Sequence, residues 1–151
     1  MLDIVISDTS CLILLNNIGA IDLLQKLYNK ITTTTEVAEE FGDYLPNWIV
    51  IKAAKDKHYQ KILELQIDRG EASAIALAIE FETCTLIVDD NKARKVAKSL
   101  GLNITGTIGI IVKAKLNGVI PSIKPYLVKI QETNFRISES LIKEALLKAE
   151  E

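Results

Sequence analysis

Acidic residues recur in this chain where predicted strands end and where predicted helices begin. Asp8 follows the β-branched run at residues 4–6, and the pair Asp89-Asp90 follows a second apolar run that ends at Val88. The carboxyl ends of parallel strands share one edge of a sheet, and open α/β sheets place their chemistry at that edge. We therefore expect Asp8 to meet Asp89 and Asp90 if their two strands are neighbours.

Helices that start near this edge can deliver two glutamates to the same place. Glu40 lies on the predicted helix after the second strand, and Glu71 opens an alanine-rich helix. Thr9 and Ser10 follow Asp8 and add short oxygen-bearing side chains that support it. The candidate catalytic residues are thus Asp8, Glu40, Glu71 and Asp90, and the candidate metal ligands are Asp8, Asp89, Asp90 and Glu71.

These acids would crowd one another, and crowded carboxylates repel, which raises their pKa values. A divalent cation removes that cost, and oxygen ligands without a Cys or His cluster favour Mg²⁺ or Mn²⁺ over zinc. The single histidine, His58, lies far from the acids in sequence, so a histidine-based dyad or a zinc site is poorly supported. Attack of a metal-activated water on a phosphodiester is the reaction best matched to such a pocket.

Each acid also has a purely local interpretation. Asp8 and Asp90 are both suited to cap the helices that follow them. Glu71 forms a capping-box pattern with Asp68, and the glutamates at 39–40 could be solvated residues of a helix surface. The joint pattern, rather than any single acid, therefore carries the prediction of a metal site.

The elements that must position these acids alternate along the chain. Short runs rich in β-branched or apolar residues predict strands at 4–6, 30–34, 48–51, 83–88 and 103–105. Apolar residues at helical spacing predict helices at 11–16, 20–28, 54–66, 71–81, 91–100, 107–117, 122–132 and 138–150. A capping box of Thr33 and Glu36 predicts a further helix that ends at Gly42. In the helix at 54–66 the expected buried side consists of Tyr59, Ile62, Leu63 and Leu65. This alternation predicts an α/β fold with a mainly parallel sheet that is covered on both faces.

The composition sets further bounds. The chain has 151 residues, 48% of them hydrophobic, which is enough for one domain over residues 1–151 with an aliphatic core. Its net charge of -2 gives no global basic field, which disfavours a non-specific DNA-coating protein. Two cysteines, no basic leader and no apolar run near the ~18–20 residues of a membrane span predict a reduced, cytoplasmic protein without membrane contact.

Four segments follow one another in the order Val-Ile-Ser-Asp-Thr-Ser-Cys-Leu-Ile, Glu-Val-Ala-Glu-Glu, Asp-Arg-Gly-Glu-Ala-Ser-Ala-Ile-Ala-Leu-Ala and Leu-Ile-Val-Asp-Asp-Asn-Lys-Ala-Arg. A Gly-Thr-Ile-Gly segment follows at 106–109. Over about residues 3–120 this pattern resembles the PIN-domain ribonucleases, and in particular their VapC-like branch. The resemblance implies a three-layer α/β/α sandwich of about five strands, with the first strand central and the fourth beside it. It also implies cleavage of single-stranded RNA that depends on Mg²⁺ or Mn²⁺.

The same resemblance implies roles for individual residues. Asp8 matches the family's first-strand metal ligand, and Ser10 matches the small polar residue that supports it. Glu40 matches the glutamate on the helix after strand two, and Glu71 stands where many relatives carry a third acid. Asp90 matches the acid after the fourth strand, and its neighbour at 89 is a second candidate for that role.

A basic helix follows the last of these acids. It carries four basic side chains that could hold RNA phosphates, although they could equally form an ordinary solvated face; they are Lys92, Arg94, Lys95 and Lys98. Three further lysines could extend this patch, namely Lys113, Lys115 and Lys124. Because the chain shows no aromatic ladder for stacking on bases, we expect binding led by shape and by the RNA backbone.

The C-terminal segment at 138–150 predicts an amphipathic helix with Leu141, Ile142, Ala145 and Leu146 on one side. Such a stripe packs on its own domain, on a second copy or on an inhibitory protein. The resemblance to VapC-like toxins implies both a homodimer and a cognate antitoxin as partners.

Three functions are compatible with these patterns. The leading hypothesis is a metal-dependent endoribonuclease that acts as the toxin of a VapBC-like toxin–antitoxin pair. The alternative is a catalytically silent PIN-like protein-interaction module. A phosphoryl-transfer or receiver-like domain is less well supported because the chain has no G-x-x-x-x-G-K phosphate loop.

Overall fold

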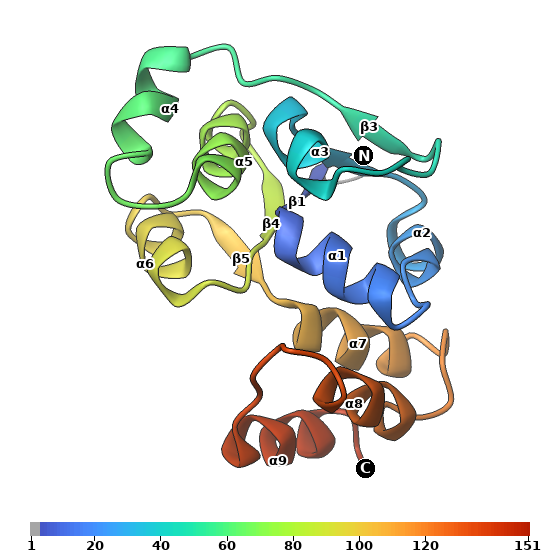
Figure 1. Cartoon of the computed structure of the whole chain (residues 1–151). Helices are drawn as coiled ribbons and strands as arrows, with labels where there is room; N and C mark the ends of the chain where they lie inside the picture. The colour runs from blue at the N-terminus through green and yellow to red at the C-terminus, as the bar shows by residue number, and fades with distance from the viewer. Residues whose placement is uncertain (1–3) are drawn as a thin grey trace.

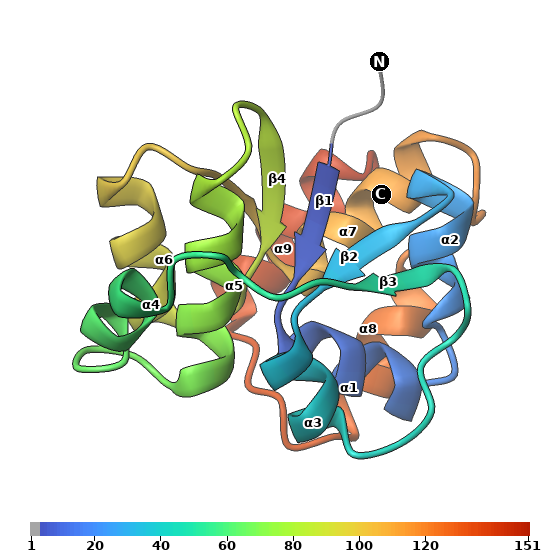
Figure 2. The same ribbon diagram turned by 90° about the horizontal axis from the view of Figure 1, so that it is seen from above.

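The computed structural model describes residues 4–151 and contains a five-stranded, all-parallel sheet in the order β3-β2-β1-β4-β5. The strands are β1 (Ile4–Ser7), β2 (Ile31–Thr33), β3 (Ile49–Ile51), β4 (Cys84–Ile87) and β5 (Asn103–Thr105). β1 is central and β4 lies beside it, with Ile4 opposite Cys84 and Ser7 opposite Ile87 (Figure 2). The predicted α/β class, the parallel sheet and the central first strand are therefore confirmed.

Nine helices occur in the part of the chain that the structure describes. They are α1 (Thr9–Asn17), α2 (Asp22–Tyr28), α3 (Thr35–Phe41), α4 (Lys57–Leu63), α5 (Arg69–Ile79), α6 (Asn91–Ser99), α7 (Thr107–Leu116), α8 (Lys124–Gln131) and α9 (Glu139–Lys148). Figure 1 shows α4, α5 and α6 on one side of the molecule, and α7, α8 and α9 stacked beyond α1. None of the helices within residues 4–151 is long and apolar enough to span a membrane.

Each face of the sheet buries its own apolar cluster, because successive strand side chains point to opposite faces. Val5 and Ile87 belong to the cluster shared with α1, α2 and α7–α9. Ile6 and Leu86 belong to the second cluster, which α5 and α6 complete with alanine-rich faces. Burial on both faces explains why these strands are continuous apolar runs rather than alternating ones.

Three local predictions are wrong. Thr33 does not cap α3; its hydroxyl donates to the Ser7 carbonyl, and the N-cap is Thr34, which accepts from the Val37 amide. α4 is shorter than the predicted 54–66, and Leu65 lies beyond it with an exposed fraction of 85%. Ile62, also expected in the core, has an exposed fraction of 57%.

The start of α1 also differs from the prediction. Helical geometry begins at Thr9 rather than residue 11, because Asp8 caps the helix directly after the strand. Strand and helix thus meet with no intervening loop. This abrupt junction fixes the position of the Asp8 side chain at the carboxyl edge of the sheet.

α9 packs against α7 of its own chain. Ala145 and Ala149 are buried in the larger apolar cluster. The Glu151 carboxylate accepts from the Ile123 amide and the Ser122 hydroxyl, and Lys115 donates to the Ala149 carbonyl. These contacts attach the C-terminal helix to the domain, as one of the sequence interpretations expected.

Candidate active site

Asp8 lies at the carboxyl end of β1, where its amide donates to the Ile87 carbonyl of β4. Its carboxylate is buried, with an exposed fraction of 1%. Oδ1 accepts from the Cys11 amide at 3.0 Å, and Oδ2 accepts from the Asp89 amide at 3.3 Å. Burial and the charge of Asp89 raise the pKa of Asp8 from 3.8 to about 8, although these two amide bonds oppose the rise. Asp8 is therefore both a helix cap and an acid whose ionised form is unfavourable in its buried position.

The Asp89 carboxylate is held by the start of α7. The Thr107 amide donates to Oδ1 at 2.9 Å, and the Thr107 hydroxyl donates to Oδ2 at 2.5 Å. Burial raises the pKa of Asp89, while the bonds from Thr107 and the positive charge of Arg94 oppose that rise. Both oxygens of this acid thus have a protein donor, which fixes its orientation.

Gly106, just before α7, is required by this arrangement. A Cβ at this position would lie 2.7 Å from Oδ1 of Asp89 and 3.1 Å from a guanidinium nitrogen of Arg94. That same Arg94 nitrogen donates to the Val88 carbonyl at 2.8 Å. The Gly-Thr pair at 106–107 therefore receives the Asp89 carboxylate without a clash.

Glu71 lies in the first turn of α5 and is half-buried. Burial, followed by the negative charges of Asp90, Asp68 and Glu40, raises its pKa from 4.5 to about 7. Its Oε2 atom is buried without a hydrogen-bond partner. A buried carboxylate oxygen without a donor is costly, so this atom is suited to a ligand that carries positive charge.

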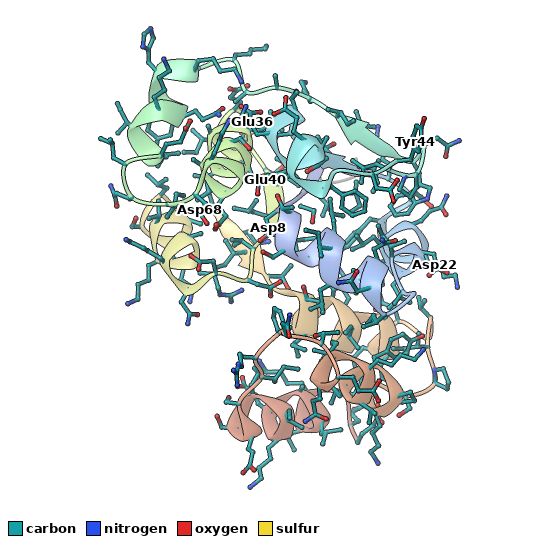
Figure 3. The ribbon with its side chains drawn as sticks, in the orientation of Figure 1. Asp8, Asp22, Glu36, Glu40, Tyr44 and Asp68 are labelled. Carbon is teal, nitrogen blue, oxygen red and sulfur yellow. The ribbon has the colours of Figure 1, made fainter. Side chains whose placement is uncertain are left out.

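Glu40 reaches this group of acids across the α3–α5 contact. A Cβ on Gly70 would collide with Oε1 of the Glu40 carboxylate and would lie 3.0 Å from the Thr9 hydroxyl. The small Ser73 side chain allows the helices to approach and bonds the Thr34 hydroxyl at 2.6 Å. Figure 3 labels Asp8, Glu40 and Asp68 in one region of the molecule, where β1, α3 and α5 meet.

The remaining predicted site residues are Asp90, Thr9 and Ser10, and their surroundings differ. Asp90 caps α6 by accepting from the Ala93 amide at 2.9 Å, yet its charge still acts on Glu71. The Thr9 hydroxyl is buried without a partner beside Gly70, whereas Ser10 is exposed in the first turn of α1. The predicted role of Asp90 as a helix cap is therefore confirmed. The predicted capping box of Asp68 and Glu71 is wrong, because Asp68 makes no side-chain hydrogen bond to the start of α5.

The side chains of the predicted basic patch are not all available to bind RNA. Lys92, Lys95 and Lys98 are exposed on α6. Arg94 is half-buried and commits one nitrogen to the Val88 carbonyl. It therefore braces the turn after β4, and its positive charge acts on Asp89.

The donor set fits a hard divalent cation. All the candidate groups are oxygens, and within residues 4–151 the Oε2 of Glu71 and the hydroxyl of Thr9 have no hydrogen-bond partner. Burial, together with the charges of neighbouring acids, raises the pKa values of Asp8 and Glu71. Within residues 4–151, however, no three His, Cys, Asp or Glu side chains stand in coordinating positions at once. The acids form two neighbouring groups, one of Asp8 with Asp89 and one of Glu71 with Asp90, Asp68 and Glu40.

Sequence reasoning missed the residues that hold these acids in place. Thr107 and Gly106 lie in the Gly-Thr-Ile-Gly segment, and Gly70 precedes Glu71 in the Gly-Glu-Ala helix start. Both segments stand out in the sequence, but their role in positioning the acids cannot be predicted without knowing which acid packs against each of them. A glycine directly before a helix or an acid was the available signal, since it marks a close approach.

Comparison with protein families identifies the kind of domain that this fold represents. No curated protein matches the chain. A family model described as a PIN domain matches residues 4–151, which include every candidate residue above. PIN domains are generally nucleases that depend on divalent metals and act on nucleic acid. The fold, the acids at the carboxyl edge of the sheet and this match together identify the chain as a member of the PIN domain family.

Proposed function

We propose that this protein is an endoribonuclease that cleaves single-stranded RNA and depends on Mg²⁺ or Mn²⁺. The observation that carries the proposal is the buried Asp8 carboxylate, bonded to the Asp89 amide across two strands at the edge where Glu71, Asp90 and Glu40 also gather. A cluster of raised carboxyl pKa values at the carboxyl edge of a parallel sheet is typical of an active site.

Asp8, Glu71 and Asp90 would hold the metal, with Asp89 as a further candidate. The metal, when bound, supplies a water activated for attack on a phosphodiester and positive charge for the phosphate. Asp89 orients the site, since Thr107 occupies both of its oxygens and its own amide fixes Asp8. Glu71 is placed to hold or transfer a proton, because its pKa lies near neutrality, and Glu40 is the neighbouring catalytic acid whose charge acts on it.

The three exposed lysines of α6 would bind RNA phosphates on either side of the cut, with Arg94 contributing its free nitrogens. Ser10 would support Asp8 from the first turn of α1, and Thr9 would do so from its buried position. In this proposal residues 1–151 act as a single nuclease domain in the cytoplasm.

We further propose that the protein is a VapC-like toxin that forms a homodimer and is restrained by an antitoxin. The order of its four acidic segments and the Gly-Thr-Ile-Gly segment support this assignment. Growth arrest on induction, relieved by co-expression of a protein encoded beside it, would test the proposal. Unchanged growth with a protein that cleaves RNA in vitro would contradict the toxin role alone.

The nuclease proposal can be tested with matched variants of neighbouring glutamates. Wild type should cleave a single-stranded RNA oligonucleotide with Mn²⁺, and Asp8→Asn or Glu40→Gln should lower kcat/KM by at least ~100-fold. Glu39→Gln is the control, because Glu39 is exposed and pairs with Arg69 at 3.0 Å. Equal cleavage by wild type and Asp8→Asn would overturn the mechanism.

A catalytically silent interaction module is the second candidate. The lack, within residues 4–151, of three acids already in coordinating positions favours it. In that case Mn²⁺ would neither bind to the protein nor raise its melting temperature. Mn²⁺ titration followed by calorimetry separates the two candidates without any RNA.

A further inference from the structure

A cleft of about 1060 Å³ lies beside the acidic site and has no role in the mechanism described above. The turn after β4, the start of α6, β5 and the length of α7 line one part of it, and the segment between α8 and α9 together with α9 lines the other. Figure 1 shows α6 and α9 toward the same side of the molecule, with α7 beginning between them. Asp89 lines the cleft, and its amide donates to the Asp8 carboxylate, so the cleft and the acidic site share this residue.

The walls of the cleft combine two kinds of side chain. Its apolar lining includes Ile104, Ile108, Val112, Phe135 and Leu141. Its charged lining has four basic side chains (Arg94, Lys113, Arg136 and Lys148) against two acids (Asp89 and Glu144). A ligand that suits both parts has a flat apolar portion and an anionic portion joined together.

The basic side chains are not equally available. Lys148 pairs with Glu144 at 2.9 Å, and Lys113 lies 4.6 Å over the Tyr28 ring. Arg94 donates from one nitrogen to the Val88 carbonyl. Among the described residues that line the cleft, Arg136 is thus the basic side chain for which no protein partner is found, and it is exposed. It is the cation best placed to bind an anion from solution.

We propose that this cleft holds an unpaired nucleotide of the RNA, next to the phosphodiester that is cut. The base packs on Phe135 and the apolar lining, and Arg136 and the free nitrogens of Arg94 bind the flanking phosphates. The inference deepens the proposed nuclease function and rests on it. It also modifies the expectation of purely backbone-led binding, since one aromatic ring suffices to hold one base.

The cleft is favoured as an RNA subsite over a protein-docking groove for two reasons. Its excess of positive charge stands out on a chain whose net charge is -2. An RNA strand that places a phosphate at Asp8 must also leave the site, and the cleft is lined by Asp89, whose amide contacts Asp8. A volume of this size is ample for a base with its ribose.

The test measures binding of RNA that is not cleaved. In an Asp8→Asn background, anisotropy of a labelled single-stranded RNA gives Kd as a function of salt. Arg136→Ala should reduce the slope of log Kd against log salt by about 0.7, the value for one lost phosphate contact on a single strand. Lys61→Ala, which removes an exposed lysine on the distant α4, should leave the slope unchanged.

A second variant tests the base contact. Phe135→Leu keeps an apolar side chain at a half-buried position but loses the aromatic face. It should weaken binding of intact RNA by at least about fivefold and leave binding of an abasic ribose-phosphate oligomer of equal length unchanged. Equal weakening of both ligands, or none, would overturn the inference, as would an unchanged salt slope for Arg136→Ala.

The two proposals fail separately. Wild-type protein that cleaves no RNA would overturn the nuclease function, while the binding measurements still report on the cleft. Wild-type cleavage with unaltered binding by both variants would overturn only the nucleotide subsite and assign the cleft to a protein partner.

Discussion

The amide of Asp89 donates to Oδ2 of Asp8 at 3.3 Å, and so ties the ends of β1 and β4 together at the edge of the sheet. The same residue acts on Asp8 in two opposite ways. Its amide stabilises the ionised carboxylate, whereas its own negative charge raises the pKa of Asp8. The balance leaves Asp8 neutral near physiological pH until a cation compensates both charges.

The stability of the metal-free protein should fall as the pH rises. The pKa of Asp8 is raised from 3.8 to about 8 and that of Glu71 from 4.5 to about 7, so the folded state binds protons more tightly than the unfolded state. The contribution of these two groups to the free energy of unfolding is fully present below about pH 4 and is lost as the pH rises through 7 and 8. Urea unfolding with EDTA between pH 4 and pH 9 measures it.

Asp8→Asn removes the larger shift and should flatten this pH dependence, raising stability at pH 8 by at least about 1–2 kcal/mol. Asp22→Asn is the control, because Asp22 is an exposed partner of Lys26 on α2. Parallel pH profiles for wild type and Asp8→Asn would contradict the raised pKa of Asp8.

Metal binding should release protons. At pH 7 most Asp8 carboxyls and about half of the Glu71 carboxyls are protonated, and a cation requires both to ionise. We expect Mn²⁺ to displace about one proton at pH 7 and to bind more tightly at pH 8. Calorimetry in two buffers of different ionisation enthalpy measures this number. Binding without proton release would show that Asp8 and Glu71 are not ligands.

Thr107→Val should impair catalysis with little change in fold. It keeps the amide bond to Asp89 but removes the hydroxyl that donates to Oδ2. Loss of a supporting contact of this kind lowers activity by about 10–100-fold. Thr107→Ser retains the hydroxyl and should keep near wild-type kcat/KM. If Ser and Val behave alike, the hydroxyl does not position Asp89.

Gly70→Ala should act through Glu40. The added Cβ would collide with Oε1, and the flexible end of the glutamate would move away at small cost in stability. We expect kcat/KM to fall by about 10–100-fold with a nearly unchanged melting temperature. In a Glu40→Ala background the same substitution should have almost no further effect on rate. Additive losses would show that Gly70 matters for another reason.

Asp90→Asn separates the two roles of Asp90. Asparagine caps helices about as well as aspartate, so α6 should keep its stability, whereas Asp90→Ala should lose about 1 kcal/mol. Both variants lose the charge that acts on Glu71 and should lose cleavage activity. Full activity in Asp90→Asn would leave Asp90 with only the local capping role.

The sheet was predictable because its strands are buried on both faces. The β-branched run at 4–6 and the apolar run before Asp89 are typical of strands buried in a parallel sheet. The carboxyl ends of such strands lie at one edge of the sheet, so the acids that follow them come together there. The local prediction at Thr33 failed because two consecutive threonines offered the same cap, and only the strand pairing decides that Thr33 bonds Ser7. The exposed Ile62 shows the same limit, since helical spacing does not reveal which side of a short helix meets α5.

The separate roles of Asp89 and Asp90 were also beyond sequence reasoning. Consecutive residues after a strand point in different directions, and which one faces Asp8 depends on the turn that follows. Here the Thr107 amide donates to the Asp89 carboxylate, and the Ala93 amide of α6 donates to the Asp90 carboxylate. The partner that settles the choice lies 18 positions further along the chain.

Every carboxylate assigned to the site has been synthesised by position 90, but the hydroxyl that braces Asp89 arrives with Thr107. On the ribosome, a growing polypeptide therefore carries all of its acids before it has the means to arrange them. The bond that orients the Asp89 carboxylate can form only after α7 has emerged from the exit tunnel, so an unfinished chain lacks the complete arrangement of its acids.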